Sequence, residues 1–554
     1  MATNLFTGKK ELTNQKLRGG YYTPEVLAEY IVNWAIRTST DTILEASCGD
    51  GNFVVAAINQ LKNNGLKKKA SIIAVELTKE EIFKAKQRAS LLKTDINMMW
   101  YNNDFFKVYK KLKNKKINVV IGNPPFIRFQ NFDNESREYA FSLLHEVGYH
   151  PTKLSNTWSA FVQLSIELLS EGGRLAMVVP AEILQVQYAK ELRQRITQQF
   201  EQITLVTFKK LVFSNIQQEV VLLLAEGKRA TLSSNCLFHT VEIENEDDLH
   251  SETLQKKISH ADTKHSCMDV KWTSFFLNNE EFENLYLLNK DKKVKKLGEF
   301  ASVNVGIVTG RNKFFILTDE VLKKYNLAKF SVPLVGKTNA LNKLVFSTKD
   351  FNTFSKDNPA YMLKLQDVDE AIFNSGLREY IALGEDEGVH LGYKCRIRKR
   401  WYDIPSTHIS EGFLFRQIYK YPLLVANEQK AACTDTIHRV ILKDKDIEIK
   451  QLAASFVNSL TFAWSEVGGR SYGGGVLELE PSEAMELPVL YTKDIILDTN
   501  FIDEMIRNNE IEKALDYVDE KLLIEYYGYS RKEVLLLRAA WEKLRDRRLY
   551  RSKA

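Results

Sequence analysis

Apolar residues in the first 225 positions alternate between short continuous runs and stretches with the spacing of an amphipathic helix. The continuous runs predict buried strands at residues 42–46, 71–77, 117–121, 174–179, 202–208 and 219–225. The helical spacing predicts helices at residues 25–37, 52–63, 79–92, 157–169 and 181–199. Strands that alternate with helices in this way are typical of a wound α/β domain.

Two of these helices begin at recognisable start signals. Thr23-Pro24 combines a capping threonine with a proline in the first turn of the helix at 25–37. Thr78-Lys79-Glu80-Glu81 has the spacing of a capping box for the helix at 79–92.

The pattern of the chain changes near residue 245. Residues 242–252 are polar and acid-rich, which is typical of a boundary between domains. Beyond them lie short strand patterns with many lysines and aromatic residues, so we expect a mixed α+β second domain. The expected parts are a first domain at 1–245, a linker region at 246–290, a second domain at 291–500 and a helical, basic C-terminal segment at 501–554.

Composition limits the class of protein. A chain of 554 residues with 44% hydrophobic residues is long enough for two or three domains with cores of their own. No apolar run has membrane-spanning length, and the first residues lack the apolar core of a signal peptide. The 5 cysteines are scattered without a CxxC pair, which favours a cytoplasmic protein without a metal site. A net charge of +6 permits a nucleic-acid partner without requiring one.

The residues Asn123-Pro124-Pro125-Phe126 follow the predicted strand at 117–121 after a single glycine. Two consecutive prolines cannot continue a sheet ladder because neither carries an N–H, so this segment forms a stiff loop. The Asn123 side-chain oxygen and the Pro124 carbonyl can accept hydrogen bonds from an exocyclic amine, and Phe126 can stack on the ring that bears it. This combination predicts a loop that directs an amine nitrogen at an electrophile, and the plainer interpretation is a proline-rich turn.

A second group of motifs predicts a nucleotide-like ligand at the same edge of the sheet. Gly49 and Gly51 lie between a strand and a helix, where a tight turn can approach a ligand. Glu76 ends the next strand, and its carboxylate can bind both hydroxyls of a ribose. Asp104 and Phe105 follow another expected strand and suit an adenine ring. Because the carboxyl ends of parallel strands share one crevice, we expect these groups to face the tetrapeptide.

In these motifs the first half of the chain resembles the amino-group DNA methyltransferases, whose catalytic motif reads Asn/Asp-Pro-Pro-Tyr/Phe. The resemblance implies a Rossmann-like, S-adenosylmethionine-dependent catalytic domain at 1–245. It assigns catalysis to Asn123, Pro124, Pro125 and Phe126. It assigns stacking on the target base to Phe126 and Phe213. It assigns binding of the methyl donor to Tyr22, Thr23, Glu45, Ser47, Gly49, Gly51, Glu76, Asp104, Phe105 and Asn123.

The order of the motifs matches the gamma arrangement of the adenine-N6 enzymes, in which target recognition lies in the C-terminal half. The resemblance therefore implies a site-specific adenine-N6 DNA methyltransferase, the modification part of a restriction-modification system. Its partners would be double-stranded DNA and a separate cognate restriction endonuclease, and its target adenine would be flipped out of the duplex. The resemblance implies no metal.

Three basic and aromatic segments of the second half predict contacts with DNA. They lie at 305–315, 394–402 and 467–475. Their candidate contact residues are Arg311, Lys313, Arg396, Arg398, Arg400, Arg470 and Tyr472. Arginine can read base edges, and arginine and lysine both neutralise phosphates. For any one of these segments, a solvated surface is the alternative interpretation.

Other functions stay open on the sequence alone. Similar tetrapeptides serve enzymes that methylate RNA or a protein glutamine, and the same two acceptors suit the amine of cytosine-N4. A DNA-binding scaffold with an inactive site is a further alternative, although Glu76, Asp104 and Asn123 are all present. Because the catalytic motifs begin close to the first residue, we expect no nuclease domain upstream of them.

Overall fold

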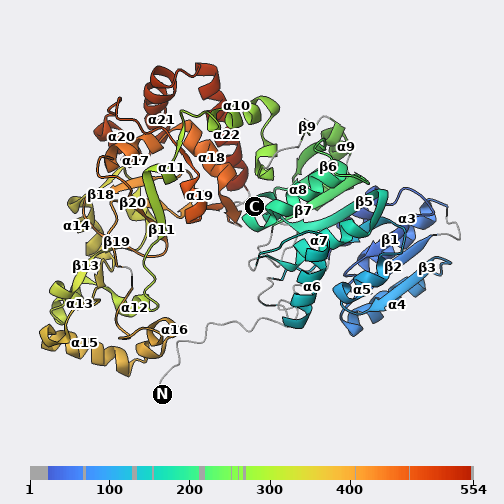
Figure 1. The fold of residues 1–554 in the computed structure, drawn as a ribbon, viewed down its shortest axis with the longest axis horizontal. Helices are drawn as coiled ribbons and strands as arrows, with labels where there is room; N and C mark the ends of the chain where they lie inside the picture. The colour runs from blue at the N-terminus through green and yellow to red at the C-terminus, as the bar shows by residue number, and fades with distance from the viewer. Residues whose placement is uncertain are drawn as a thin grey trace. The chain divides into compact units, whose positions relative to one another are not determined.

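The computed structural model describes residues 23–65, 70–127, 131, 134–152, 155–210, 212, 219–250, 252–259, 261, 263–265, 270–405, 407–472 and 474–550. The chain divides into two compact units (Figure 1). Unit 1 comprises residues 1–279 and 553–554, and unit 2 comprises residues 280–552.

Unit 1 is built on one mixed sheet. Its described strands are β1 (Thr42–Glu45), β2 (Ser71–Glu76), β3 (Asn97–Asn102), β4 (Ile117–Gly122), β5 (Leu169–Pro180), β6 (Phe200–Phe208), β7 (Val220–Lys228), β8 (Leu237–Ile243) and β9 (Lys264–His265). They lie in the order β3-β2-β1-β4-β5-β7-β6-β8-β9. Neighbours from β3 to β5 are parallel, and β7 runs antiparallel between β5 and β6. This order confirms the predicted Rossmann-like α/β domain.

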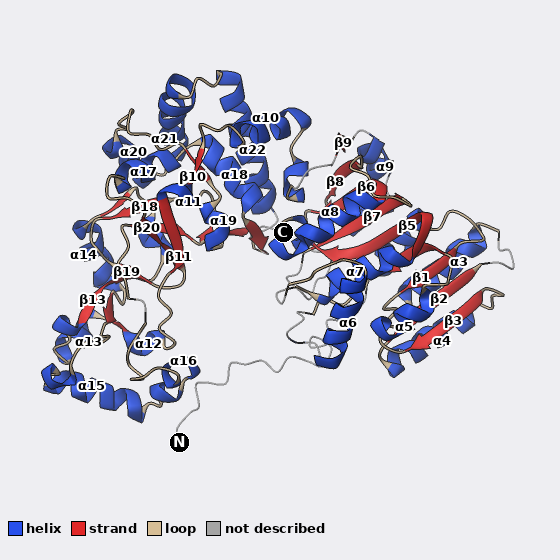
Figure 2. Ribbon diagram, in the orientation of Figure 1, coloured by secondary structure: helices blue, strands red, loops and turns tan. Residues whose placement is uncertain are grey.

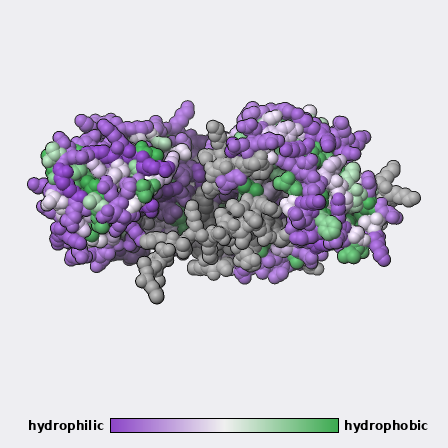
Figure 3. Space-filling view, turned by 90° about the horizontal axis from the view of Figure 1, so that it is seen from below, coloured by the Kyte–Doolittle hydropathy of each residue, from purple (hydrophilic) through white to green (hydrophobic). Residues whose placement is uncertain are grey.

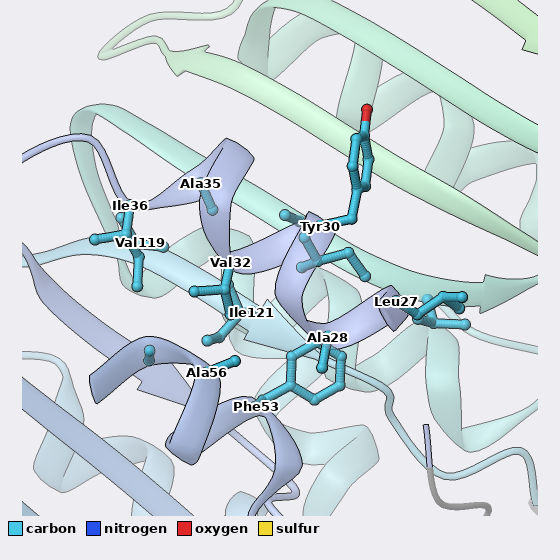
Figure 4. Packing of buried hydrophobic residues seen from close by; sticks show 14 of the residues in the cluster. Leu27, Ala28, Tyr30, Val32, Ala35, Ile36, Phe53, Ala56, Val119 and Ile121 are labelled. Carbon is cyan, nitrogen blue, oxygen red and sulfur yellow. The ribbon is translucent and has the colours of Figure 1, made fainter. Parts of the chain in front are cut away.

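Helices flank both faces of this sheet (Figure 2). They are α2 (Glu25–Ala35), α3 (Asn52–Asn63), α4 (Lys79–Leu91), α5 (Phe105–Leu112), α6 (Asn134–Glu146), α7 (Thr157–Leu168), α8 (Lys190–Gln199) and α9 (Glu252–Ser259). Helices α2 and α3 share one buried cluster with alternate residues of the central strands, as Figure 4 shows.

The packing of β4 shows how the sheet is held between its helices. Val119 and Ile121 lie in the cluster with Val32 of α2 and Phe53 of α3, and each of the four is at most 4% exposed. Val120 lies between the two β4 residues and therefore points to the opposite face. Burying one such side chain stabilises the fold by roughly 1.5–3 kcal/mol. The strand that leads into the tetrapeptide is thus anchored on both faces.

Several predicted elements differ from the observed ones. Residues 181–199 were predicted as one helix. They form two 3-10 turns, Ala181–Leu184 and Gln187–Ala189, followed by α8. The predicted caps are also wrong, because neither α2 nor α4 has a side-chain cap hydrogen bond. The Thr23 hydroxyl and the Thr78 backbone amide are used instead in the site described below.

The region 246–290 is not a separate linker in the structure. Residues up to 279 belong to unit 1, where β9 pairs with β8 and extends the sheet. The rings of Trp272 and Phe275 pack on Phe238 with centroids 5.0 and 4.3 Å away. The acid-rich composition of residues 242–252 suggested a linker, but burial of these downstream aromatic residues attaches the region to the sheet. Helix α10 (Asn279–Asn289) begins unit 2.

Unit 2 is a mixed α+β unit with several small sheets, as predicted. Its strands are β10 (Lys295–Lys296), β11 (Ala301–Val305), β12 (Ile316–Leu317), β13 (Ser331–Val335), β14 (Val345–Phe346), β15 (Tyr361–Leu363), β16 (Gly412–Phe415), β17 (Gln417–Ile418), β18 (Leu424–Asn427), β19 (Ala432–Cys433), β20 (Ile437–Leu442), β21 (Arg470–Tyr472), β22 (Val476–Glu478) and β23 (Pro488–Val489). The two larger sheets, among the described residues, have the orders β11-β20-β16-β18-β14 and β12-β15-β13-β19.

The helices of unit 2 surround these sheets. After α10 they are α11 (Leu297–Phe300), α12 (Asn312–Phe315), α13 (Asp319–Lys324), α14 (Thr348–Asp357), α15 (Ser375–Asp386), α16 (Tyr393–Arg396), α17 (Ile449–Phe456), α18 (Ser459–Gly468), α19 (Pro481–Met485), α20 (Thr499–Arg507), α21 (Ile511–Val518) and α22 (Arg531–Tyr550). A π-helical turn at Asp519–Tyr526 follows α21.

In the described part of the chain, no helix has the length and apolar character needed to cross a membrane. The face shown in Figure 3 is mainly hydrophilic in both units, with small hydrophobic areas.

The basic C-terminal helix α22 is attached to the interior of unit 2 by a buried arginine. Arg548 of α22 is only 3% exposed, and its guanidinium binds the Glu466 carboxylate of α18 at 3.0 Å (Nε–Oε2) and 2.6 Å (Nη2–Oε1). The same guanidinium donates to the carbonyl oxygen of Tyr419 at 2.8 Å. The predicted C-terminal segment at 501–554 is therefore integrated into unit 2 over its described residues, through α20, α21 and α22.

Replacing Arg548 with methionine tests this attachment. It leaves the Glu466 carboxylate buried without its partner, so the free energy of unfolding should fall by about 3–5 kcal/mol. The exposed Arg531 of the same helix pairs with Glu520, and its replacement with alanine should cost less than about 1 kcal/mol. Urea denaturation followed by circular dichroism measures both, and equal small losses would contradict the assigned role of Arg548.

Candidate active site

The carboxyl ends of four parallel strands meet at one edge of the sheet in unit 1. Glu45 at the end of β1 is in register with Ala74 of β2 and Ile121 of β4. Glu76 at the end of β2 pairs with Asn102 of β3. The loops that follow these strands therefore lie side by side, as the sequence predicts for a wound sheet.

Thr23 connects two of these loops, those that follow β1 and β4. The Asn123 side-chain amide donates from Nδ2 to the Thr23 hydroxyl at 3.1 Å. The Thr23 carbonyl accepts from Nδ2 of Asn52, the first residue of α3, at 2.8 Å. From the glycine turn, the Ser47 hydroxyl donates to the Asn123 carbonyl at 3.3 Å. Thr23 is 5% exposed, so this junction is shielded from water. It fixes the amide of Asn123 with its nitrogen on Thr23 and its oxygen on the other side.

Thr157 holds the far end of the same loop. This first residue of α7 is fully buried, and its hydroxyl donates to the Pro125 carbonyl at 2.6 Å. The hydroxyl also accepts from the Ile127 amide at 3.1 Å, while the Thr157 amide donates to the Ile127 carbonyl at 2.8 Å. The Asn123-Pro124-Pro125-Phe126 loop is thus fastened at both ends, by Thr23 and by Thr157.

The glycine turn is tied to the end of β2 by Glu76. One carboxylate oxygen accepts from the Gly49 amide at 3.0 Å, and the other accepts from the Thr78 amide at 2.8 Å. Gly49 and Gly51 both have positive φ, +50° and +95°. A Cβ on Gly51 would lie 2.8 Å from Cβ of Ala85, whereas a Cβ on Gly49 would have nothing within 4 Å. Gly51 is therefore required for packing on α4, and Gly49 borders open space.

Glu45 is the most strongly perturbed acid at this edge. It is fully buried, and neither of its oxygens makes a hydrogen bond of normal geometry with a described group. Burial, followed by the charge of Glu76, raises its pKa well above the usual range, and the Ser47 backbone amide offsets this only in part. Burial, followed by the charges of Glu45 and Glu76, raises the pKa of the Cys48 thiol, which disfavours its thiolate form.

Asp104 and Phe105 lie where the sequence predicts, directly after β3. The Asp104 carboxylate caps α5 by accepting from the Phe106 amide at 2.8 Å. The Phe105 ring is 2% exposed and stacks on Phe161 with centroids 5.0 Å apart. Both residues therefore have structural contacts, and their part in binding a ligand stays a prediction.

Phe126 is half-buried and packs against the main cluster of unit 1. Tyr22 and Phe213, predicted to contact the donor and the target base, lie outside the described residues.

The predicted DNA contacts of unit 2 separate into two groups. Arg311, Lys313 and Arg396 are exposed. Three other arginines make internal contacts: Arg398 donates to the Thr309 carbonyl at 2.7 Å, Arg400 binds both oxygens of Asp403, and Arg470 pairs with Glu483 at 3.0 Å. The side chain of Tyr472 lies outside the described part. Contact of these residues with DNA stays a prediction.

Comparison with known families decides the class of this enzyme. A family model described as N-6 DNA Methylase matches residues 8–299. The chain belongs to the N-6 DNA methylase family. A second model, described as the C-terminal domain of the type II methyltransferase M.Eco57I, matches residues 269–523.

Individual proteins are similar to the chain over most of its length. Type II methyltransferase M.AccI of Acinetobacter calcoaceticus is 21% identical over 526 residues, which cover 91% of this chain and 90% of that protein. M.HindII of Haemophilus influenzae is 23% identical over 348 residues, covering 59% and 60%. Among solved structures, the Type IIL restriction-modification enzyme MmeI in complex with DNA shares the fold with a TM-score of 0.56 at 12% identity, over 92% of this chain and 73% of that one.

The predictions of class, activity and cofactor are thereby confirmed. The protein is an adenine-N6 DNA methyltransferase of the restriction-modification type, and its methyl donor is S-adenosylmethionine.

The strand ends of unit 1 fit this donor, which carries a positive sulfonium and an ammonium group. Three carboxylates, those of Glu45, Asp50 and Glu76, lie at or beside the glycine turn, and the space beside Gly49 is open. Each Glu76 oxygen accepts one backbone amide and retains a second lone pair for a ribose hydroxyl.

Three contributions to this site were not predicted from the sequence. Thr23 was predicted to contact the donor. Its hydrogen bond with Asn123 joins residues that are 100 positions apart, so no local sequence pattern predicts that bond. The bond of Asn52 to Thr23 could not be predicted for the same reason, since it spans 29 positions. Thr157 was predicted only as a helix residue, because a helix start does not indicate which distant loop its hydroxyl binds.

The raised pKa of Glu45 leads to a test by proton linkage. A cationic donor beside Glu45 should lower that pKa, so binding should release a proton. The affinity for S-adenosylmethionine should then increase as the pH rises through the raised pKa and level off above it. Calorimetry in two buffers of different ionisation enthalpy measures the release. Glu45→Gln should abolish the part of the release due to Glu45, and an unchanged release in this variant would contradict the assignment.

Proposed function

We propose that the protein recognises one sequence in double-stranded DNA, flips an adenine out of it and methylates N6, as the modification partner of a separate restriction endonuclease. The observation that supports this most is the fixed amide of Asn123. It lies at the strand ends beside Glu45, Gly49 and Glu76, and its nitrogen is bound to Thr23.

The oriented amide supports a catalytic role for the loop. With Nδ2 of Asn123 committed to Thr23, Oδ1 is the end of the amide that accepts a hydrogen bond from the adenine amine. The Pro124 carbonyl accepts the second amine hydrogen. S-adenosylmethionine supplies an electrophilic methyl group. Pulling on both hydrogens aims the nitrogen lone pair away from the ring. The new N–C bond would replace the donor's S–C bond, whose electron pair stays on sulfur, and one amine proton would pass to water. No side chain needs to deprotonate the amine beforehand.

Flipping the base costs a few kcal/mol in lost stacking and pairing. Phe126, the last residue of the loop, has a partly exposed ring. Stacking of a base on such a ring is worth roughly 1–3 kcal/mol, which offsets much of that cost. The rigidity of the loop, fastened by Thr23 and Thr157, lets the flipped base meet acceptors that are already in position.

Recognition of the sequence falls to unit 2 in this proposal. Its exposed Arg311, Lys313 and Arg396 supply contacts to bases and phosphates, while Arg398 and Arg400 hold the loops that carry them.

Replacing Asn123 with alanine tests the central assignment. The variant loses an acceptor that acts only as the amine becomes the nucleophile, so turnover should fall about 10²–10³-fold while donor affinity is retained. Incorporation of tritiated methyl groups into unmethylated genomic DNA measures turnover, and calorimetry measures the donor. Asn97→Ala, on an exposed end of β3, is the matched control and should leave both unchanged.

Parallel reactions with RNA and with protein as substrate complete the test. An Asn123→Ala variant with near-normal turnover would contradict the assignment of the loop. Incorporation into RNA or protein, and not into DNA, would contradict the proposed substrate.

A further inference from the structure

Four large apolar side chains lie exposed on two neighbouring segments of unit 2. The segments are the loop at 306–313, which runs into α12, and the turn at 389–399, which includes η9 (Val389–Leu391) and α16. Val308 is 43% exposed, Leu391 67%, Tyr393 66% and Ile397 62%. Leaving side chains of this size in water forgoes roughly 1.5–3 kcal/mol each, so a cluster of them indicates a binding surface.

The two segments are held together by direct contacts. Arg398 reaches across and donates to the carbonyl oxygens of Thr309 at 2.7 Å and Val308 at 3.4 Å. Gly310, with φ +84°, brings the loop so close that a Cβ there would lie 2.6 Å from Cβ of Lys394. The four apolar residues therefore belong to one continuous surface, which we call the apolar–basic surface. Figure 1 shows α12, α15 and α16 at the same end of unit 2.

A rigid aromatic core supports this surface. The Arg398 guanidinium lies over the ring of Phe315 at 5.4 Å, and Phe314 stacks on Tyr380 at 4.6 Å and 17°. The Tyr380 hydroxyl donates to the Phe314 carbonyl at 2.7 Å. Trp401 packs on Phe314 in the same cluster, with centroids 5.2 Å apart. The exposed side chains thus project from a fixed base.

The charges around the four apolar residues are of one sign. Neither segment contains an acidic residue. Their exposed cations are Arg311, Lys313, Lys394, Arg396 and Lys399. Acids flank the second segment: Glu385, Asp386 and Glu387 lie in the preceding helix end, and Asp403 follows the segment and binds Arg400. Glu385 accepts a bond from the Trp401 indole at 3.1 Å. A polyanion is therefore the partner that this charge pattern fits.

We infer that the apolar–basic surface inserts apolar side chains between neighbouring base pairs of the bound duplex, at a step other than the target adenine. Leucine and isoleucine are among the residues that open base steps as wedges, and an exposed tyrosine can stack on the base that is uncovered. The flanking cations neutralise the phosphates of the two opened nucleotides. This inference rests on the proposed function, because it needs a specific DNA duplex as the ligand.

Opening such a step serves the flipping reaction. A duplex that is kinked within the bound site is already partly unstacked, which lowers the cost of a further distortion such as base flipping. The surface would then contribute to sequence preference without any hydrogen bond to a base, because flexible pyrimidine–purine steps open at lower cost than others.

Duplexes with 2-aminopurine at successive positions test the inference, once the methylated position has been mapped. Its fluorescence rises where stacking is lost. The intact enzyme should change the signal at the target and at one separate step. The triple variant Leu391→Ala/Tyr393→Ala/Ile397→Ala should lose the separate signal and keep the signal at the target.

Affinity provides the second measurement. Tyr393→Ala should weaken specific binding about five- to a hundredfold, with an unchanged salt slope, and Tyr393→Phe should restore it. Arg396→Ala should lower the salt slope by about 0.9 and keep the separate fluorescence signal. Ile496→Ala, at a residue 84% exposed elsewhere in unit 2, is the matched control and should change neither.

The outcomes distinguish this inference from the proposed function. If the intact enzyme methylates the duplex but changes no signal away from the target, or if the triple variant keeps that change, the wedge is wrong and the proposed function stands. If no duplex gives a signal at any position or accepts methyl groups, the proposed function itself is wrong.

Discussion

The hydrogen bond between the Asn123 amide and the Thr23 hydroxyl is the contact on which the active site depends. It joins the segment before α2 to the loop after β4, and the Thr23 carbonyl extends the connection to Asn52 at the start of α3. A side-chain amide has two chemically different ends, and only a specific partner determines which end faces which way. In the structure the nitrogen end faces Thr23 and the oxygen end faces away, so a residue 100 positions away in the sequence helps to hold the acceptor for the target amine.

The two units use their polar residues for different purposes. In unit 1, Glu76, Ser47 and Thr157 bind backbone groups and hold loops at the strand ends. In unit 2, three of the five predicted DNA-binding arginines make contacts within the protein. Arg398 and Arg400 fasten loops, so that neighbouring cations and apolar residues can project from them. A cluster of arginines in a sequence therefore includes both residues that shape a surface and residues that bind with it.

Much of unit 1 could be predicted from the sequence because its signals are local. The apolar runs at 42–46 and 117–121 became β1 and β4 within a residue or so, since a buried strand needs continuous apolar residues whatever its neighbours are. The predicted caps failed because capping signals do not show the tertiary contacts of the same residues. Helix α2 begins after Pro24, and the hydroxyl of Thr23 pairs with the distant Asn123. The backbone amide of Thr78 binds Glu76, and its side chain makes no cap bond. The pairing of Arg548 with Glu466 could not be predicted either, because the sequence of the basic tail fits a brace of the second domain as well as contact with the DNA backbone until α18 is placed beside it.

The central claim is that Thr23 orients Asn123 for catalysis, and a pair of substitutions at Thr23 tests it most directly. Thr23→Ser keeps the hydroxyl, whereas Thr23→Val keeps the shape and removes it. The single-turnover rate of methyl transfer, measured at saturating S-adenosylmethionine and DNA, should stay near normal in the serine variant. It should fall about tenfold in the valine variant, the factor that corresponds to the loss of one hydrogen bond of ~1.4 kcal/mol. A valine variant that transfers the methyl group as fast as the serine variant would contradict the account.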